Sequence, residues 1–224
     1  LELQSITDIE ESIYRSENPK LFIGFNRRFS ESVQFIKQKL INSPANSINL
    51  RFSVPPLDID HWTNMKEIGG GRIVGEAVHG IDLACYLFDS LPQSISVFAP
   101  IDKTNNMVKD NQVFLNINFA NGSHASLQYF SETNQILSKE RIEVHGGGNS
   151  YIMEDFRMLR FLEGSQDRTK TFSSGKGHKE SLATFFDYVR DKSNNPFTWQ
   201  EIKAVSKAAI IAQENINSGQ QHKV

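Results

Sequence analysis

Residues 113–129 read VFLNINFANGSHASLQY, two runs in which apolar and polar side chains alternate on either side of an Asn-Gly pair. Alternation with a period of two is typical of strands that bury one face. Asn-Gly between two such runs is the strongest short signal for a hairpin turn. The stretch therefore predicts two antiparallel strands joined by a tight turn.

The same pattern continues on both sides of this hairpin, over most of residues 94–172. Apolar side chains at strand spacing predict further strands at 142–144, 151–155, 158–162 and 169–172. An earlier alternating segment, 48–54, predicts one more strand, which ends at Pro55-Pro56.

Helical periodicity flanks this region of strands. The apolar spacing predicts helices over 5–16, 30–41, 72–88, 181–191 and 199–216. Helices first, strands in the middle and helices last indicate an α+β domain with an open, mostly antiparallel sheet and helices on one face. We expect the other face to be exposed or to pair with a second copy of the chain, as a homo-oligomer.

Composition excludes several classes of protein. The 224 residues are 38% hydrophobic and 22% charged with a formal net charge of -2, which argues against disorder and against a nucleic-acid partner. Cys85 is the single cysteine, so an intrachain disulfide is impossible and a reducing, cytoplasmic location is expected. No apolar run reaches membrane-spanning length, so no membrane partner is expected.

The first 25 residues differ from the rest of the predicted domain. The segment 20–25, KLFIGF, predicts a short buried strand directly after the first helix. A helix followed by an apolar strand is the repeating unit of a parallel sheet. The chain also opens on Leu1 without a methionine, so we expect these residues to be the end of a domain that precedes them.

The richest set of reactive side chains lies in residues 69–82, GGGRIVGEAVHGID. On a helix, Arg72, Glu76, His79 and Asp82 fall three or four positions apart and share one face. A histidine one turn from carboxylates suits general base catalysis, because a carboxylate can fix its tautomer. The alternative is a solvated helix face with incidental pairs.

Two further clusters are weaker. Residues 58–62, DIDHW, precede the glycine run and fit either a ligand contact or a surface loop. Residues 175–180, GKGHKE, lack the glycine and the Ser or Thr of a phosphate-binding loop, so nucleotide hydrolysis is excluded.

Neither a metal site nor a dinucleotide site is expected in this chain. No glycine-rich fingerprint follows a predicted strand, so no dinucleotide-binding motif is present. The possible metal ligands are scattered without a zinc-type spacing; they are Asp58, Asp60, His61, Glu76 and His79.

Taken together, these motifs resemble one family. The succession GFNRRF at 24–29, the glycine run followed by His79 and Asp82, and Gly177-His178 before a Phe-rich helix resembles the Gfo/Idh/MocA oxidoreductases. The resemblance covers nearly the whole chain. Residues 71–76, GRIVGE, with Asp60-His61-Trp62 before them, are similar to the branch that is often fused behind a zinc-type alcohol dehydrogenase domain.

The resemblance implies a division of the parent protein into two domains. Family members carry an N-terminal Rossmann domain, followed by an open-sheet domain like the C-terminal domain of dihydrodipicolinate reductase. Residues 1–25 would then be the last helix and strand of a missing dinucleotide-binding domain, and residues 26–224 the domain for substrate binding and oligomerisation. NAD or NADP is expected in the full-length protein, with none bound to this chain alone.

The resemblance also implies roles for individual residues. His79 is the proton-transfer residue and Asp82 supports it. Gly75 stands where the family usually has an aspartate, with Glu76 beside it as the candidate replacement. The remaining candidates are substrate contacts: Arg27, Asp60, His61, Trp62, Arg72 and His178.

The function implied is oxidation or reduction at a hydroxyl of a sugar, a polyol or a sugar nucleotide with NAD(P). The alternative is a non-catalytic module for oligomerisation or ligand binding that derives from the same fold. In that case Gly75 would mark the lost chemistry.

Overall fold

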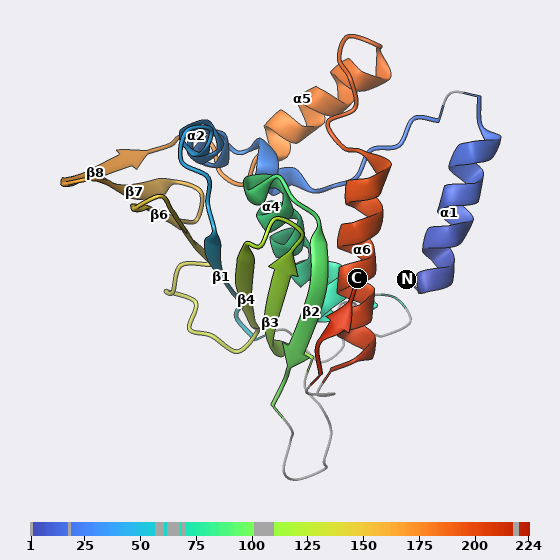
Figure 1. Cartoon of the computed structure of the whole chain (residues 1–224), viewed down its shortest axis with the longest axis horizontal. Coiled ribbons are helices and arrows are strands. Elements are labelled where there is room, and N and C mark those ends of the chain that lie inside the picture. The colour runs from blue at the N-terminus through green and yellow to red at the C-terminus, as the bar shows by residue number, and fades with distance from the viewer. Residues whose placement is uncertain are drawn as a thin grey trace.

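The computed structural model describes residues 2–17, 19–56, 61, 68, 70–100, 110–216 and 220–224. Their nine strands form one open sheet with the order β8-β7-β6-β5-β1-β4-β3-β2-β9 (Figure 1). Its strands are β1 (Ser47–Ser53), β2 (Pro92–Phe98), β3 (Gln112–Phe119), β4 (His124–Phe130), β5 (Glu140–Gly146), β6 (Asn149–Glu154), β7 (Met158–Glu163), β8 (Gln166–Thr171) and β9 (His222–Lys223).

The sheet is antiparallel except where β1 lies between β4 and β5. β1 pairs parallel with β4, with Leu50 opposite Leu127, and antiparallel with β5. The hairpin predicted from 113–129 is confirmed, because β3 and β4 pair antiparallel on either side of a turn in which Gly122 has a φ of 86°. The α+β class and the mostly antiparallel sheet are confirmed as well.

The helices also lie close to their predicted positions. Ser30 caps the second helix by accepting a hydrogen bond from the Val33 amide, and Thr198 and Glu201 form a capping box at the start of the last helix. The helical elements are α1 (Leu3–Arg15), η1 (Asn26–Phe29), α2 (Glu31–Leu40), η3 (Ile73–Ala77), α4 (Val78–Phe88), α5 (His178–Val189) and α6 (Trp199–Glu214).

The core lies between one face of the sheet and the helices that cover it. Leu50, Leu115 and Leu127 project from the sheet into this core and are almost fully buried. Gly80 lets α4 approach closely, since a Cβ there would lie 2.8 Å from a methyl group of Leu127. Because this helix is held against the sheet, the polar residues on its first turns have fixed positions.

The opposite face of the sheet is open and mainly polar. Asn49, Asn116 and Gln128 project from its central strands, with Phe98 and Phe114 as exposed aromatic residues near one side. The prediction that helices cover only one face is therefore confirmed. Within the described part of the chain, no helix combines the length and apolar character needed to cross a membrane.

The strand expected at residues 20–25 was wrong. These residues adopt neither helix nor strand. The ring of Phe22 instead packs edge-on against Phe185 and Phe197, and the side chain of Asn195 donates a hydrogen bond to the Leu21 carbonyl. An apolar run forms a strand only when a neighbouring strand offers backbone partners, and among the described residues none lies beside this segment.

The two-residue strand β9 was missed by the sequence analysis. His222 pairs with Ile95 at the outer edge of β2. So short a segment carries no periodicity, and its conformation follows from the free edge of the neighbouring strand.

Candidate active site

A cavity of about 350 Å³ opens where the first turns of the α4 region meet one end of β1 and β4. Its walls come from segments that are far apart in the chain, so only the folded domain creates it. The described residues that line it are Asn26, Arg27, Phe52, Val54, Gly75, Glu76, His79, Tyr129, Lys139, Glu140, Lys176 and His178.

A turn of π-helix, η3, leads into α4 and presents Gly75 and Glu76 to the cavity. π-helical turns insert one extra residue and occur often at functional sites. Gly71, two residues before this turn, has a φ of 97°, and a Cβ there would lie 2.4 Å from the side-chain oxygen of Gln213. The same oxygen accepts a hydrogen bond from the backbone amide of Ile73. Because Gln213 belongs to α6, this helix fixes where η3 begins.

The side chains of Arg72 and Tyr129 fix the carboxylate of Glu76. The Arg72 guanidinium contacts its carboxylate at 2.7 Å, and the Tyr129 hydroxyl donates a hydrogen bond to it at 2.8 Å. Burial, together with the nearby Glu76 charge, raises the pKa of the Tyr129 hydroxyl, so this hydroxyl keeps its proton. Arg72 itself is buried and acts as a positioning residue.

A second carboxylate of the lining, the buried Glu140, joins two cations. Arg27 binds Glu140 through two parallel hydrogen bonds of 2.8 and 2.9 Å, and the Lys176 ammonium contacts the same carboxylate. Burial alone would raise the pKa of the Glu140 carboxyl, but the two cations hold this pKa below its usual range. Glu140 is therefore ionised and anchors both cations at the cavity wall.

His79 lines the same cavity as these two groups. Its ring packs edge-on against Phe25 at 5.7 Å between centroids, and its buried Nδ1 has no hydrogen-bond partner among the residues that the structure describes. Burial, together with the charge of Arg27, lowers the pKa of His79 to about 3. The imidazole is therefore neutral at neutral pH, and Nε2 is the ring nitrogen left to meet a ligand.

Close backbone packing brings Lys176 and His178 to the cavity. Gly177 has a φ of 80°, and a Cβ there would lie 2.5 Å from the carbonyl oxygen of Asn26. The Asn26 side chain donates a hydrogen bond of 2.7 Å to the Lys176 carbonyl. The segment around Gly177 is thus docked directly onto η1, which carries Arg27.

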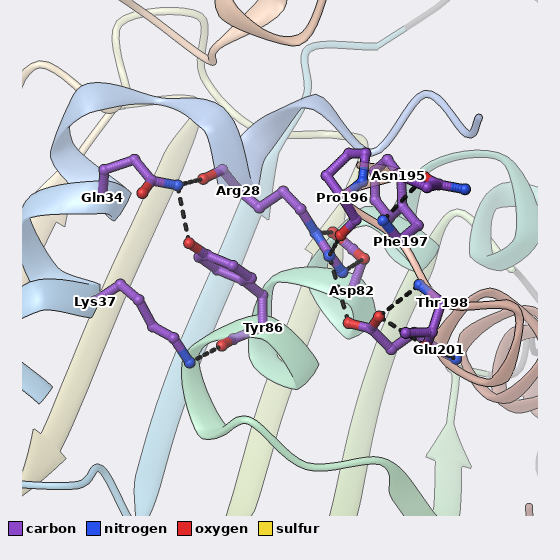
Figure 2. A network of polar contacts seen from close by, with 10 residues as sticks. All are labelled: Arg28, Gln34, Lys37, Asp82, Tyr86, Asn195, Pro196, Phe197, Thr198 and Glu201. Atoms are coloured by element: carbon purple, nitrogen blue, oxygen red, sulfur yellow. Dashed lines mark hydrogen bonds and ion pairs between the residues drawn. The ribbon is translucent and has the colours of Figure 1, made fainter. Parts of the chain in front are cut away.

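Asp82, expected to support His79, has a different partner. Its fully buried carboxylate binds the Arg28 guanidinium, which also contacts Glu201 at 3.4 Å (Figure 2). The guanidinium stacks over the rings of Tyr86 and Phe197. Burial raises the pKa of the Asp82 carboxyl to about 6, against the pull of Arg28. The expected pairing of Asp82 with His79 is therefore corrected to an ion pair between η1 and α4.

Arg72 needs a similar correction. It was expected to touch the substrate, but it is 3% exposed and stands behind Glu76 and Tyr129. Both corrections have one physical reason: a charged side chain that turns into the protein is stable only beside an opposite charge, and spacing along a helix does not reveal that charge.

The remaining predicted residues divide by position. Arg27, Glu76, His79 and His178 line the cavity. His61 is described but is not among the lining residues, and Asp60 and Trp62 lie outside the described residues. No group of three or more His, Cys, Asp or Glu within the described ranges is arranged to hold a metal ion.

The sequence analysis missed several lining residues. Lys176 had a signal, its place between Gly175 and Gly177, but the stretch was considered only as a nucleotide loop. Glu140 and Tyr129 had none, because they belong to an ordinary strand pattern and gain their role only from Arg27 and Glu76.

The chain is similar to known proteins both in part of its sequence and in its fold. Residues 45–152 match the model of the GFO/IDH/MocA C-terminal domain. No curated protein sequence matches the chain at a significant level.

Solved structures share the fold at low sequence identity. A levoglucosan dehydrogenase in complex with NADH and levoglucosan is 16% identical with a TM-score of 0.84, over 100% of this chain and 70% of that one. UDP-N-acetylglucosamine 3-dehydrogenase from Acidithiobacillus ferrooxidans is 13% identical with a TM-score of 0.79, over 97% and 68%. An aldose-aldose oxidoreductase from Caulobacter crescentus complexed with glycerol is 14% identical with a TM-score of 0.78, over 100% and 69%.

Proposed function

We propose that the chain, whose residues 45–152 match the model of the GFO/IDH/MocA C-terminal domain, is the substrate-binding part of an NAD(P)-dependent oxidoreductase. Its substrate would be a sugar, a polyol or a sugar nucleotide that reacts at a hydroxyl. The observation that carries the proposal is the position of His79 on the wall of a cavity that also holds fixed cations and carboxylates.

The described residues do not fit a nicotinamide dinucleotide by themselves. The parallel pair β1 and β4 is not joined as a glycine-containing βαβ unit, which is what a dinucleotide pyrophosphate requires. We therefore propose that a preceding domain, to which residues 1–25 belong, holds the cofactor, and that residues 26–224 bind the substrate. When bound, such a cofactor exchanges a hydride with the substrate carbon.

The residues of this chain would handle the hydroxyl. Because the His79 imidazole is unprotonated at neutral pH, its Nε2 can accept the hydroxyl proton. Arg27, fixed by its two bonds to Glu140, can donate to a neighbouring oxygen. Glu76, fixed by Arg72 and Tyr129, can accept from a second hydroxyl. Hydroxyl-rich substrates suit such a site because each buried hydroxyl needs a partner.

The proposal is tested by turnover of the full-length protein with NAD(P) and a panel of sugars. Replacing His79 by alanine is expected to lower kcat by about a hundredfold or more, while His124→Ala, on the open face of the sheet, leaves it unchanged. An unaltered rate for His79→Ala would remove this residue from the mechanism.

One observation favours the second candidate, a non-catalytic ligand-binding module. No described group orients the imidazole through Nδ1, and Gly75 stands where the family usually has an aspartate. Sugar binding by the full-length protein without any nicotinamide-dependent absorbance change would support this module over the enzyme.

Two further parts of the proposal concern the setting of the protein. The open face of the sheet is proposed to join two copies of the chain, supported by the exposed Phe98 and Phe114 among its polar residues. A cytoplasmic location is proposed, supported by the single, buried thiol of Cys85. The relation to proteins fused to a zinc-type alcohol dehydrogenase domain stays a prediction.

A further inference from the structure

The charges around the cavity are not balanced. Its described lining includes two carboxylates, and each has its own arginine: Glu76 is paired with Arg72 at 2.7 Å, and Glu140 with Arg27 at 2.8 Å. Within each pair, the arginine neutralises the charge of its carboxylate. Any further cation at the wall therefore adds net positive charge.

Two lysines supply that charge. Lys176 contacts Glu140, a carboxylate that Arg27 already binds with both of its oxygens. Lys139 lines the same cavity from the residue directly before Glu140, and it makes no ion pair with any residue in the described ranges. Two lysines thus line one cavity: Lys176 shares the Glu140 carboxylate with Arg27, and Lys139 has no ion pair among the described residues.

The environment of His79 is consistent with this excess. After burial, the charges of Arg27 and Lys176 both lower the pKa of this imidazole, and Glu140 only partly opposes them. A second cation in the cavity is thereby disfavoured, and an anion is favoured.

We propose that the substrate of this site carries an oxyanion, a carboxylate or a phosphate on a sugar-sized molecule, which Lys139 and Lys176 bind. This deepens the proposed function and rests on it, because it concerns the same cavity. A cavity of about 350 Å³ is near the lower end of ligand sites and suits a monosaccharide acid or monosaccharide phosphate. Lys139 is assigned as the specificity residue because it lines the cavity and makes no ion pair with any described residue.

Binding measurements without cofactor test the inference independently of turnover. The full-length protein is titrated calorimetrically with glucose and galactose, with their uronates, and with their 6-phosphates, at low and at high ionic strength. At least one anionic form is expected to bind about tenfold more tightly than its neutral sugar. That advantage should shrink as salt is raised. The uronates and the phosphates distinguish the two oxyanions.

A variant assigns the effect to the lysine. Lys139→Gln is expected to weaken binding of the preferred anion by about fivefold, the effect of one partly screened charge pair, and to leave the neutral sugar unchanged. Lys192→Gln, an exposed lysine just after the C-terminal end of α5, is the matched control.

The inference is wrong if no anionic form is bound more tightly than its neutral sugar, or if the two lysine variants behave alike. Neither result bears on hydride transfer, which is measured separately by turnover of the same protein. Failure of the inference and failure of the proposed function are thereby distinguished.

Discussion

The behaviour of single side chains in this domain depends on whether a buried charge has a partner. His79 is partly buried beside Arg27 and Lys176, so the neutral imidazole is the stable form. Asp82 is fully buried but lies on Arg28, so the charged pair is stable. The two residues are less than one helical turn apart, and the difference comes entirely from what packs against them.

The depressed pKa of His79 predicts how stability depends on pH. Between about pH 6.5 and about pH 3 the unfolded chain binds a proton at this imidazole and the folded protein does not, so the free energy of unfolding falls as the pH is lowered through this range. His79→Asn has no side chain that binds this proton. Its free energy of unfolding should therefore fall less than that of the wild type between about pH 7 and about pH 4.5. Urea denaturation at both pH values measures it.

The control for this experiment is His124→Asn, at an exposed position on the open sheet face. It should follow the wild-type pH dependence. Identical curves for His79→Asn and wild type would show that His79 titrates normally in the folded protein.

The Arg28–Asp82 pair predicts a large effect of a small substitution. Asp82→Asn keeps the side-chain volume but leaves the buried guanidinium with only the Glu201 carboxylate at 3.4 Å, so the free energy of unfolding should fall by about 3–5 kcal/mol. Urea denaturation at neutral pH measures the loss. Glu11→Gln, which removes the acid of the exposed Arg15–Glu11 pair, should change stability little. Equal losses in the two variants would contradict the structural role of the buried pair.

At the level of elements, the site depends on how α5 is docked onto η1. Gly177 occupies a left-handed conformation and touches the backbone of Asn26 and Ser30. The position of Lys176 and His178 at the cavity therefore depends on a glycine that has no reactive group of its own.

A glycine pair separates the two costs of adding a side chain there. Gly177→Ala adds both the left-handed strain and a backbone clash, whereas Gly122→Ala adds only the strain, because a Cβ at 122 meets nothing within 4 Å. We expect a loss of about 1–2 kcal/mol for Gly122→Ala and a clearly larger loss for Gly177→Ala, both measured by urea denaturation. A similar loss in both variants would mean that the contact with η1 relaxes without cost.

At the level of the whole molecule, one face of the sheet has no covering helix among the described residues. Phe114 lies on this face, 43% exposed and packed edge-on against Phe130. If two copies meet there, a charge at this position must be desolvated in the interface.

Phe114→Asp is therefore expected to convert a dimer into a monomer in sedimentation velocity. Phe186→Asp, which removes a similarly exposed ring from α5, is expected to leave the assembly intact. A protein that is monomeric without any substitution, or that stays assembled in Phe114→Asp, would place the oligomer contact elsewhere.

Much of the fold follows from local sequence. The alternation in 113–129 with Asn-Gly at its centre specifies the hairpin of β3 and β4, and Ser30 specifies the start of α2. These features are readable because strand alternation, helix caps and tight turns depend on residues only a few positions apart. His79 was identified in the same way, from its spacing behind the glycine run.

The remaining members of the site were decided by tertiary structure. Arg27 lies 113 positions before Glu140 and Lys176 lies 36 positions after it. Both cations nevertheless bind the Glu140 carboxylate at the cavity wall. Spacing along a helix showed that Asp82 and His79 lie near one another, but not that Arg28 binds Asp82 first. The strand expected at 20–25 failed for the same reason. The partner of a buried charge, or of the backbone of an apolar segment, is the group that the packed chain places beside it. Local sequence does not contain that information.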